Sequence, residues 1–242
     1  MRTQNLVYQR VQRPAAALIA RAAACAMSDL YEALDADQRN AALMSPRMRP
    51  VASGISMTGP AVTVQCAPGD NLMMHRGLLL AHRGDVLVVN GGAPCGAQWG
   101  LLAAVYAAKK GLAGVVVQGC IRDTGYLIEQ KCPVWFTEIS PSHPEKRGPG
   151  SVNVPIDCDG ATVYPGDVIS ADGDGVLVIP ARLLASVVEK AEMRQAHEQQ
   201  GIADIMAGRS LFEVHDLQTA LARSGVIEID EAWRGGPGGV VD

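Results

Sequence analysis

Apolar residues along this chain occur in short runs, with alanine-rich or amphipathic stretches between them. The valine-rich runs at 86–89 and 113–117 are bounded by glycine or a polar turn, which is typical of buried strands. Between them, residues 99–110 predict a helix, because Lys109-Lys110-Gly111 supplies two cations and a terminal glycine. A strand, a helix and a second strand in this order are typical of a parallel crossover. The pattern therefore predicts an α/β fold.

The other elements are predicted from similar local signals. Proline followed by an alanine-rich stretch predicts a helix over 14–27, and Ser28 as N-cap predicts a second one ending at Leu34. Residues 55–66 alternate like a half-buried strand that is broken at Gly59-Pro60. We further expect helices over 72–82 and 181–200, and strands over 132–136, 152–156, 161–163 and 176–179. With no internal repeat, we expect one domain over 1–242 with a helical extension from about 181.

Composition and charge indicate the kind of core and exclude some classes of partner. Hydrophobic residues make up 48% of the chain and aromatic residues only 4%, so we expect an aliphatic core. A net charge of −4 without a basic block argues against nucleic acid as a partner. No apolar stretch is long enough to span a membrane and no signal peptide is recognised, so we expect a cytoplasmic protein without a membrane partner. The 6 cysteines contain no C-x-x-C pair, which predicts reduced thiols.

The segment Gly-Cys-Ile-Arg-Asp at 119–123 carries the strongest chemical signal. It follows the strand predicted at 113–117, and α/β proteins usually bind ligands at strand ends. Arg122 offers a planar donor fork for a carboxylate or enolate, and Asp123 offers a hard oxygen ligand for a divalent metal. The pair predicts a site for a small 2-oxo acid, and a surface ion pair is the alternative. Cys120 is interpreted as a buried spacer rather than a nucleophile.

Other candidate motifs are weaker. The glycine-rich loop at 90–100 precedes a predicted helix and has the backbone N–H groups to bind an anion, but it matches neither a dinucleotide-binding nor a Walker motif. A simple tight turn is the alternative there. The histidines have no zinc-type spacing, and the segment 172–175 lacks the remaining ligands of a calcium loop. The lysines lie at predicted helix ends, in loops or on helix faces, so a metal is a better electrophile than a Schiff base.

Several segments, in order and spacing, resemble the 4-hydroxy-4-methyl-2-oxoglutarate / 4-carboxy-4-hydroxy-2-oxoadipate aldolases, which are grouped with RraA-type regulators of ribonuclease E. The resemblance extends from about residue 28 to about residue 200, and the segments are 67–71 with His75, 99–103, 119–123, 133–135, 150–155 and 165–176. It implies an α-β-β-α sandwich with a mixed sheet of the swivelling-domain type. It also implies a class II pyruvate aldolase of aromatic-compound catabolism that uses Mg²⁺ or Mn²⁺ and acts on a small 2-oxo acid.

The resemblance also implies site residues and an assembly. Asp123 and Glu198 would serve the metal, Arg122 would contact the 2-keto oxygen, and Glu32 would be a catalytic acid. By the resemblance, the protein forms homotrimers or homohexamers with sites at the subunit interfaces. Acidic residues of the neighbouring subunit complete each site, and by position these correspond to Glu32 and Glu198. The backbone N–H groups of Gly100, Leu101 and Leu102, at the start of the helix, would bind the substrate. The side chains of Asn71 and His75 would contact it as well.

One residue departs from the family pattern. Leu101 stands where the family aldolases usually carry an acid that holds the water shell of the metal. A leucine can neither bind a water nor relay a proton. Either Asp70, Gln98 or Glu32 substitutes, or the main reaction is another one, such as decarboxylation of a 2-oxo acid like oxaloacetate. A non-catalytic regulator that binds a protein partner is the third alternative.

Overall fold

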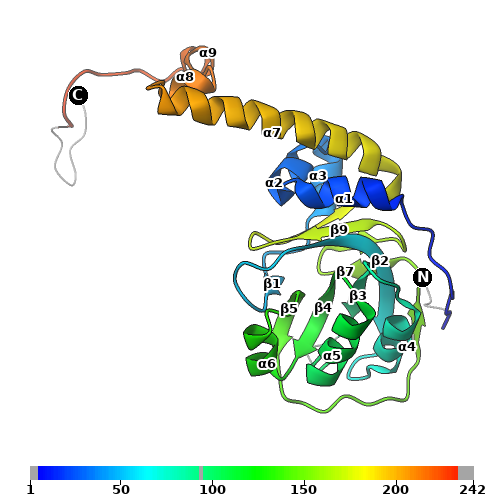
Figure 1. The fold of residues 1–242 in the computed structure, drawn as a ribbon. Coiled ribbons are helices and arrows are strands. Elements are labelled where there is room, and N and C mark those ends of the chain that lie inside the picture. Colours follow the sequence, from blue (N-terminus) through cyan, green and yellow to red (C-terminus); the bar gives the residue numbers. More distant parts are fainter. Residues whose placement is uncertain (1–4, 93–94, 234–242) are drawn as a thin grey trace. The chain divides into compact units, whose positions relative to one another are not determined.

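The computed structural model describes residues 5–92 and 95–233 of the chain (Figure 1). Two compact units are present, Met1–Gln195 and Ala196–Asp242, and each is described by itself. The boundary between them falls within the long helix α7 (Leu184–Met206). A single domain with a helical extension from about residue 181 therefore stays a prediction.

The first unit contains a mixed β-sheet in the order β1-β5-β4-β3-β2-β9-β10, with β6 paired to β2 (Figure 1). The pairs β2–β3, β3–β4 and β4–β5 are parallel, whereas β1, β6, β9 and β10 pair antiparallel. The predicted α/β fold with a mixed sheet is thus confirmed. The strands are β1 (Arg49–Pro50), β2 (Met57–Cys66), β3 (Val86–Asn90), β4 (Gly114–Ile121), β5 (Val134–Ile139), β6 (Gly150–Val152), β9 (Val168–Ala171) and β10 (Val176–Ile179), with β7 (Ile156–Cys158) and β8 (Ala161–Val163) in a separate hairpin.

Helices cover the sheet or follow it in the chain. The predicted helices over 14–27, 72–82, 99–110 and 181–200 are present, each with somewhat different ends. The strand expected over 152–156 is divided, because β6 ends at Val152 and β7 begins only at Ile156. The short elements β1, β9, α3 (Ala36–Ala42) and α6 (Thr124–Glu129) were not predicted, although Asp35 and Gln38 form a capping box at the start of α3. The helices are α1 (Ala16–Ala24), α2 (Met27–Glu32), α3 (Ala36–Ala42), α4 (Leu72–Leu80), α5 (Leu101–Lys110), α6 (Thr124–Glu129), a 3₁₀ turn at Ala181–Leu183, α7, α8 (Leu211–Val214) and α9 (Gln218–Arg223).

The predicted break at Gly59-Pro60 is wrong, because β2 continues through both residues. At this point the strand changes partner. Residues 57–60 pair antiparallel with β9, and residues 61–65 pair parallel with β3. The backbone of Gly59 also passes so close to Gly84 that an added Cβ would lie 2.2 Å from the Gly84 carbonyl oxygen. Glycine and proline therefore mark a crossing between two sets of partners rather than an interruption.

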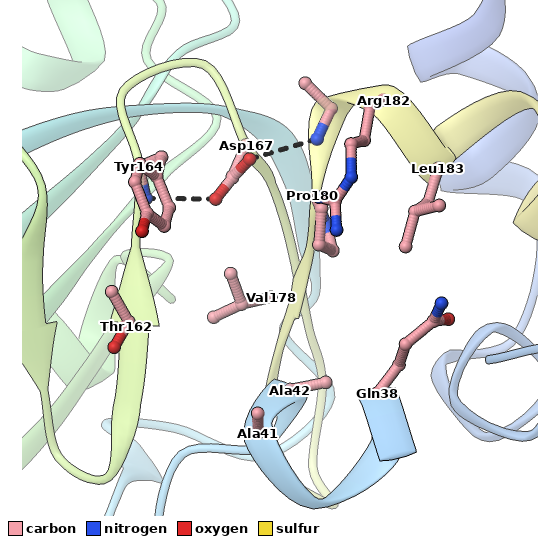
Figure 2. A pocket seen from close by; sticks show the side chains of 11 residues that line it. Gln38, Ala41, Ala42, Thr162, Tyr164, Asp167, Val178, Pro180, Arg182 and Leu183 are labelled. Atoms are coloured by element: carbon pink, nitrogen blue, oxygen red, sulfur yellow. Dashed lines mark hydrogen bonds between the residues drawn. The ribbon is translucent and has the colours of Figure 1, made fainter. Parts of the chain in front are cut away.

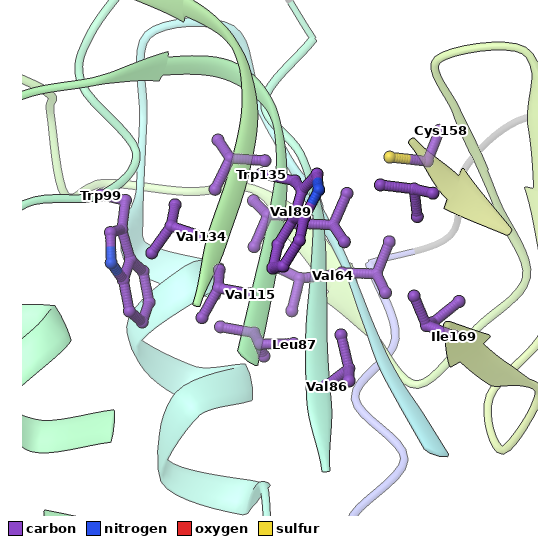
Figure 3. Close-up of a cluster of buried hydrophobic side chains, with 14 of the residues drawn as sticks. Val64, Val86, Leu87, Val89, Trp99, Val115, Val134, Trp135, Cys158 and Ile169 are labelled. Atoms are coloured by element: carbon purple, nitrogen blue, oxygen red, sulfur yellow. The ribbon is translucent and has the colours of Figure 1, made fainter. Parts of the chain in front are cut away.

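The core of the first unit is aliphatic, as the composition predicted. Valines of β2, β3 and β4 pack with two buried tryptophans, Trp99 and Trp135 (Figure 3). A second cluster joins α1, α2 and α7 to the outer strands through Leu30, Leu177 and Leu184. Ile121, the last residue of β4, is fully buried in the main core, and Arg122 and Asp123 follow it directly.

The second unit has a different character. Within its described residues, 196–233, no side chain is buried, and several large apolar side chains, such as Met206 and Ile227, are exposed. In the described part of the chain, no helix is both long enough and apolar enough to cross a membrane.

Candidate functional site

Arg122 and Asp123 lie directly after β4, where a distortion of the strand sets their direction. The pairing of β4 with β5 shifts register between Val117 and Cys120, and Gly119 adopts φ +143°, a conformation that side chains disfavour. The backbone N–H of Arg122 then donates to the backbone carbonyl of Trp99, 3.0 Å away. Asp123 adopts left-handed backbone angles, φ 57° and ψ 35°, as the residue before α6. The chain therefore turns sharply at the residue that carries the carboxylate.

The start of α5 meets this turn at close range. The Leu101 N–H donates to Asp123 Oδ2 at 2.9 Å, and Arg122 Nε lies 3.9 Å from the same oxygen. A Cβ on Gly100 would lie 2.7 Å from Asp123 Oδ2 and 3.1 Å from Arg122 Cγ, so only glycine fits without displacement. The structure thus brings together four of the predicted site residues, Gly100, Leu101, Arg122 and Asp123.

The charged groups of this cluster are open to solvent. The Arg122 side chain is 40% exposed and that of Asp123 is 43% exposed. In the described part of the chain, Asp123 Oδ1 accepts no hydrogen bond. Leu102, the next residue of α5, is 82% exposed, and helix starts leave their first N–H groups without intrahelical acceptors. The arrangement offers a guanidinium and a helix N-terminus to an anion, and a free carboxylate oxygen to a cation.

Asp70, one of the acids considered as a substitute at position 101, has a different role. Its carboxylate accepts the N–H groups of Leu72 at 2.8 Å, Gly148 at 2.9 Å and Arg147. Burial by itself would raise the pKa of Asp70, but these backbone donors outweigh it and lower the pKa, with a further contribution from Lys146. Both oxygens are used to fasten the segment around residue 147 to the start of α4. Asp70 is therefore a structural carboxylate, and the expectation that it replaces the missing acid is not supported.

The amide side chains near the site are also engaged inside the protein. Gln98 is fully buried, and its Nε2 donates to the Asp70 carbonyl at 3.1 Å and to the Gly96 carbonyl at 3.4 Å. Gln98 therefore does not face a solvent-borne metal, contrary to its expected use in place of an acid. Asn71 is buried and its Nδ2 lies 3.5 Å from the Ala97 carbonyl. The side-chain oxygens of Gln98 and Asn71 both lack a partner in the described structure.

His75 and Glu32 occupy other elements. His75 is exposed on α4, where desolvation by surrounding atoms and the charge of Lys146 lower its pKa. Glu32 lies on α2, where its carboxylate forms an ion pair with Arg194 of α7. Within the described chain neither is bonded to Arg122 or Asp123. A role for Glu32 at this site would require a second copy of the chain.

The remaining metal candidate is Glu198, an exposed residue of α7 that belongs to the second unit. Among the residues that the structure describes, no group of three or more His, Cys, Asp or Glu side chains is placed to hold a metal ion. A single chain therefore offers Asp123 alone at the strand end.

A separate cavity of about 430 Å³, which the sequence did not predict, lies in the first unit. Gln38, Tyr164, Val178 and Arg182 are among its lining residues, and none of the predicted site residues is (Figure 2). Asp167 lies at its wall with both oxygens bonded, to the N–H groups of Tyr164 and Ala181, and burial raises its pKa. No pattern in the sequence predicted this cavity, because its walls come from segments far apart in the chain.

Comparison with known proteins decides the family. The family described as RraA-like (Aldolase/RraA) matches residues 27–178, which include all of the strand-end cluster. The chain belongs to the RraA-like family. A relative from Halalkalibacterium halodurans, named provisionally as a 4-hydroxy-4-methyl-2-oxoglutarate aldolase, is 35% identical over 175 residues, or 70% of this chain and 83% of the relative. The predicted resemblance is thereby confirmed.

Solved structures, one of them of a protein described as an RraA family member, share the fold. An uncharacterised protein from Pseudomonas syringae pv. tomato matches with a TM-score of 0.74 and 26% identity, over 84% of this chain and 99% of that one. RraAS2 of Streptomyces coelicolor, described as an unusual member of the RNase ES inhibitor RraA family, matches with a TM-score of 0.69 and 26% identity, over 83% of this chain and 100% of that one. The family thus contains proteins named as aldolases and proteins named as ribonuclease inhibitors.

Proposed function

We propose that this RraA-like protein is a divalent-metal-dependent pyruvate aldolase. Its substrate would be a 4-hydroxy-2-oxo di- or tricarboxylate, such as 4-hydroxy-4-methyl-2-oxoglutarate or 4-carboxy-4-hydroxy-2-oxoadipate, and oxaloacetate decarboxylation would be a side activity. The observation that carries the proposal is the convergence of Arg122, Asp123 and the start of α5, joined by the bond from the Leu101 N–H to Asp123 Oδ2. The provisional name of the relative from H. halodurans supports the same reaction class.

Each group of the cluster has a distinct task in such a reaction. The N–H groups of Gly100 and Leu102 at the start of α5 would bind the carboxylate of the pyruvyl half, while that of Leu101 donates to Asp123. Arg122 would donate to the 2-oxo oxygen, which becomes the enolate oxygen when the bond between C3 and C4 breaks. Stabilising that charge with one directed donor contributes about 3–4 kcal/mol in comparable sites. The cluster therefore suits substrates whose cleavage releases pyruvate enolate.

The donor set at Asp123 fits Mg²⁺ or Mn²⁺. Its Oδ1 is free of hydrogen bonds in the described structure, and the side chain is 43% exposed. Magnesium commonly uses one or two protein carboxylates and keeps several waters, so a single aspartate is sufficient from one chain. When bound, the ion would supply positive charge beside the developing enolate. Glu198 of a neighbouring copy is the second proposed metal-site residue.

Cleavage also requires removal of the C4 hydroxyl proton, for which the strand-end cluster has no base because position 101 is leucine. We assign this task to Glu32 of the partner subunit in a homotrimer or homohexamer. The Glu32 side chain is 49% exposed and its own chain gives it no contact with Arg122. The proton would pass from the hydroxyl to that carboxylate while the electron pair of the broken bond forms the enolate. Decarboxylation of oxaloacetate needs no such base.

The test measures pyruvate release from 4-carboxy-4-hydroxy-2-oxoadipate and from oxaloacetate, with Mg²⁺ or Mn²⁺ and with a chelator. We expect metal-dependent release from both, and a loss of at least about 100-fold in Asp123→Asn, because the amide keeps the bond from Leu101 but loses the charge. Asp174→Asn, at another exposed aspartate of the first unit, is the control and should behave as wild type. Full activity of Asp123→Asn would remove this residue from the site.

A second candidate function is that of a regulator that binds a ribonuclease. The observation that favours it is Leu101 in place of an acid, together with a neighbour described within an RNase inhibitor family. The prediction of this alternative is a folded protein that releases no pyruvate from either substrate and that inhibits an RNase E-type enzyme. Metal-dependent turnover of the hydroxy acid would exclude it as the main function.

A further inference from the structure

Gln98 connects three segments at or beside the strand-end cluster. Its backbone N–H donates to the Cys120 carbonyl at 2.7 Å, two residues before Arg122. Its side-chain Nε2 donates to the Asp70 carbonyl at 3.1 Å and to the Gly96 carbonyl at 3.4 Å. One residue thus bonds to the end of β4, to the turn before α4 and to the glycine-rich loop.

The space for this side chain is built into the backbone. A Cβ on Gly91 would lie 2.8 Å from Gln98 Cγ, and a Cβ on Gly119 would lie 3.4 Å from the same atom. Gln98 is fully buried, so both hydrogens of its amide are needed to satisfy carbonyl groups that water does not reach. An apolar side chain of the same length would leave those carbonyls without a donor.

We propose that Gln98 is a positioning residue, which holds the start of α5 in register with Arg122 and Asp123. Gln98 is followed by Trp99, whose carbonyl accepts the Arg122 N–H, and by Gly100, the residue before α5. If the amide is lost, the 96–100 segment gains freedom, and the N–H groups that face a substrate carboxylate lose their fixed place. The inference rests on the proposed function only in its kinetic part.

The chain provides a matched control. Gln65 of β2 also donates from Nε2 to two carbonyls, those of Cys66 at 3.1 Å and Asn90 at 3.4 Å. These distances equal those made by Gln98, but neither acceptor belongs to the 96–100 segment. Gln65→Met therefore removes the same kind of contact on β2, which is separated from β4 by β3.

The experiment measures native-state hydrogen exchange of Gln98→Met and Gln65→Met in the full chain. In Gln98→Met we expect the protection factors of the Leu101 and Arg122 amides to fall about tenfold or more, because two buried carbonyls lose their donor. Amides in the centre of β3 should keep their protection, and Gln65→Met should leave Leu101 and Arg122 unchanged. Equal protection of Leu101 in Gln98→Met and wild type would overturn the proposal, and so would an equal loss in Gln65→Met.

A second variant covers the case in which Gln98→Met does not fold. In Gly91→Ala the new Cβ would lie 2.8 Å from Gln98 Cγ and 3.0 Å from the Gln118 carbonyl oxygen, so the flexible Gln98 side chain must move while its amide is kept. We expect the same local loss of protection at Leu101 and Arg122. Wild-type protection in that variant would contradict the inference.

Kinetics separate positioning from general weakening. In Gln98→Met the inhibition constant of pyruvate should rise about tenfold while kcat changes less than about threefold, since the displaced N–H groups bind the carboxylate equally in ground and transition states. A fall in kcat with unchanged pyruvate inhibition would contradict this role. If the wild type releases no pyruvate, the proposed function fails, and the exchange measurement alone decides the role of Gln98.

Discussion

The end of β4 and the layer of helices α1, α2 and α7 both present charged side chains, but the protein holds them in different ways. At the end of β4, backbone hydrogen bonds and a glycine contact fix Arg122 and Asp123. In the helix layer, exposed ion pairs connect Arg21 to Glu192, Lys190 to Asp35 and Arg194 to Glu32. Exposed ion pairs contribute little to stability and weaken as the salt concentration rises. The backbone hydrogen bonds and the glycine contact at the strand end do not depend on salt in this way. The comparison indicates that the positions of Arg122 and Asp123 are fixed by the backbone, whereas the charged side chains of the helix layer can change partners at little cost in stability.

The largest effect is expected from Arg122→Lys at the strand end. A point charge on a flexible stem cannot reproduce the directed contacts of a guanidinium, so kcat/KM for pyruvate release should fall by about 100-fold. Circular dichroism and the unfolding midpoint should stay as in wild type, because the Arg122 side chain is part-exposed. Unchanged kinetics would remove Arg122 from the mechanism.

Gly100→Ala tests whether close backbone approach fixes the carboxylate. The new Cβ would lie 2.7 Å from Asp123 Oδ2, so the carboxylate must move, and we expect about a tenfold loss of turnover. Gly125→Ala, in α6 and without an atom within 4 Å of the added Cβ, is the control and should retain activity. Equal activity of the two variants would show that the contact at Gly100 has no functional effect.

Asp70→Asn should reduce stability more than catalysis. The pKa of Asp70 is lower in the folded protein than its ordinary value near 3.8, so its ionised form stabilises the fold above that pH. This contribution is lost as pH falls through the lowered folded pKa. We expect the free energy of unfolding of the variant, measured with urea, to be lower by about 1–2 kcal/mol at pH 7. The difference should shrink as pH falls below 3.8. A pH-independent difference would show that charge is not the cause.

The smallest effect is expected in the helix layer. Glu192→Gln removes the exposed pair with Arg21, and exposed pairs of this type are largely offset by screening and side-chain entropy. The urea midpoint should stay within measurement error at 0.15 M salt, and pyruvate release should be unchanged. A loss of stability as large as that of Asp70→Asn would contradict the contrast between the two regions.

The sequence predicted much of the fold where local patterns are strong. The strands at 86–89 and 113–117 and the helix between them follow from valine runs, glycine ends and terminal lysines, all of which are local signals. The break at Gly59-Pro60 was wrong because the same two residues also suit a strand that changes partner, and pairing is a tertiary property. The short elements α6 and β9 were missed because six and four residues carry too little pattern.

The candidate site divides in the same way. Arg122, Asp123 and Gly100 could be selected from the sequence, because strand ends and helix starts are positions at which α/β folds bind ligands. The proposed substitutes for an acid at Leu101 could not be judged from sequence. Gln98 lies close in the chain to Gly100 and Asp70 does not, yet the fold directs the polar atoms of both to backbone groups.

By itself, the sequence determined the α/β class, the aliphatic core and the pair Arg122–Asp123 at the end of a strand. These depend on local propensity, periodicity and residue chemistry, which neighbouring residues settle among themselves. Only the tertiary structure decided that the Leu101 N–H meets the Asp123 carboxylate, and that Gln98 joins three segments distant in sequence. The first contact depends on where the assembled sheet places the start of α5 beside the end of β4. The second depends on which buried polar groups find partners, because an unpaired group is costly only after water has been excluded.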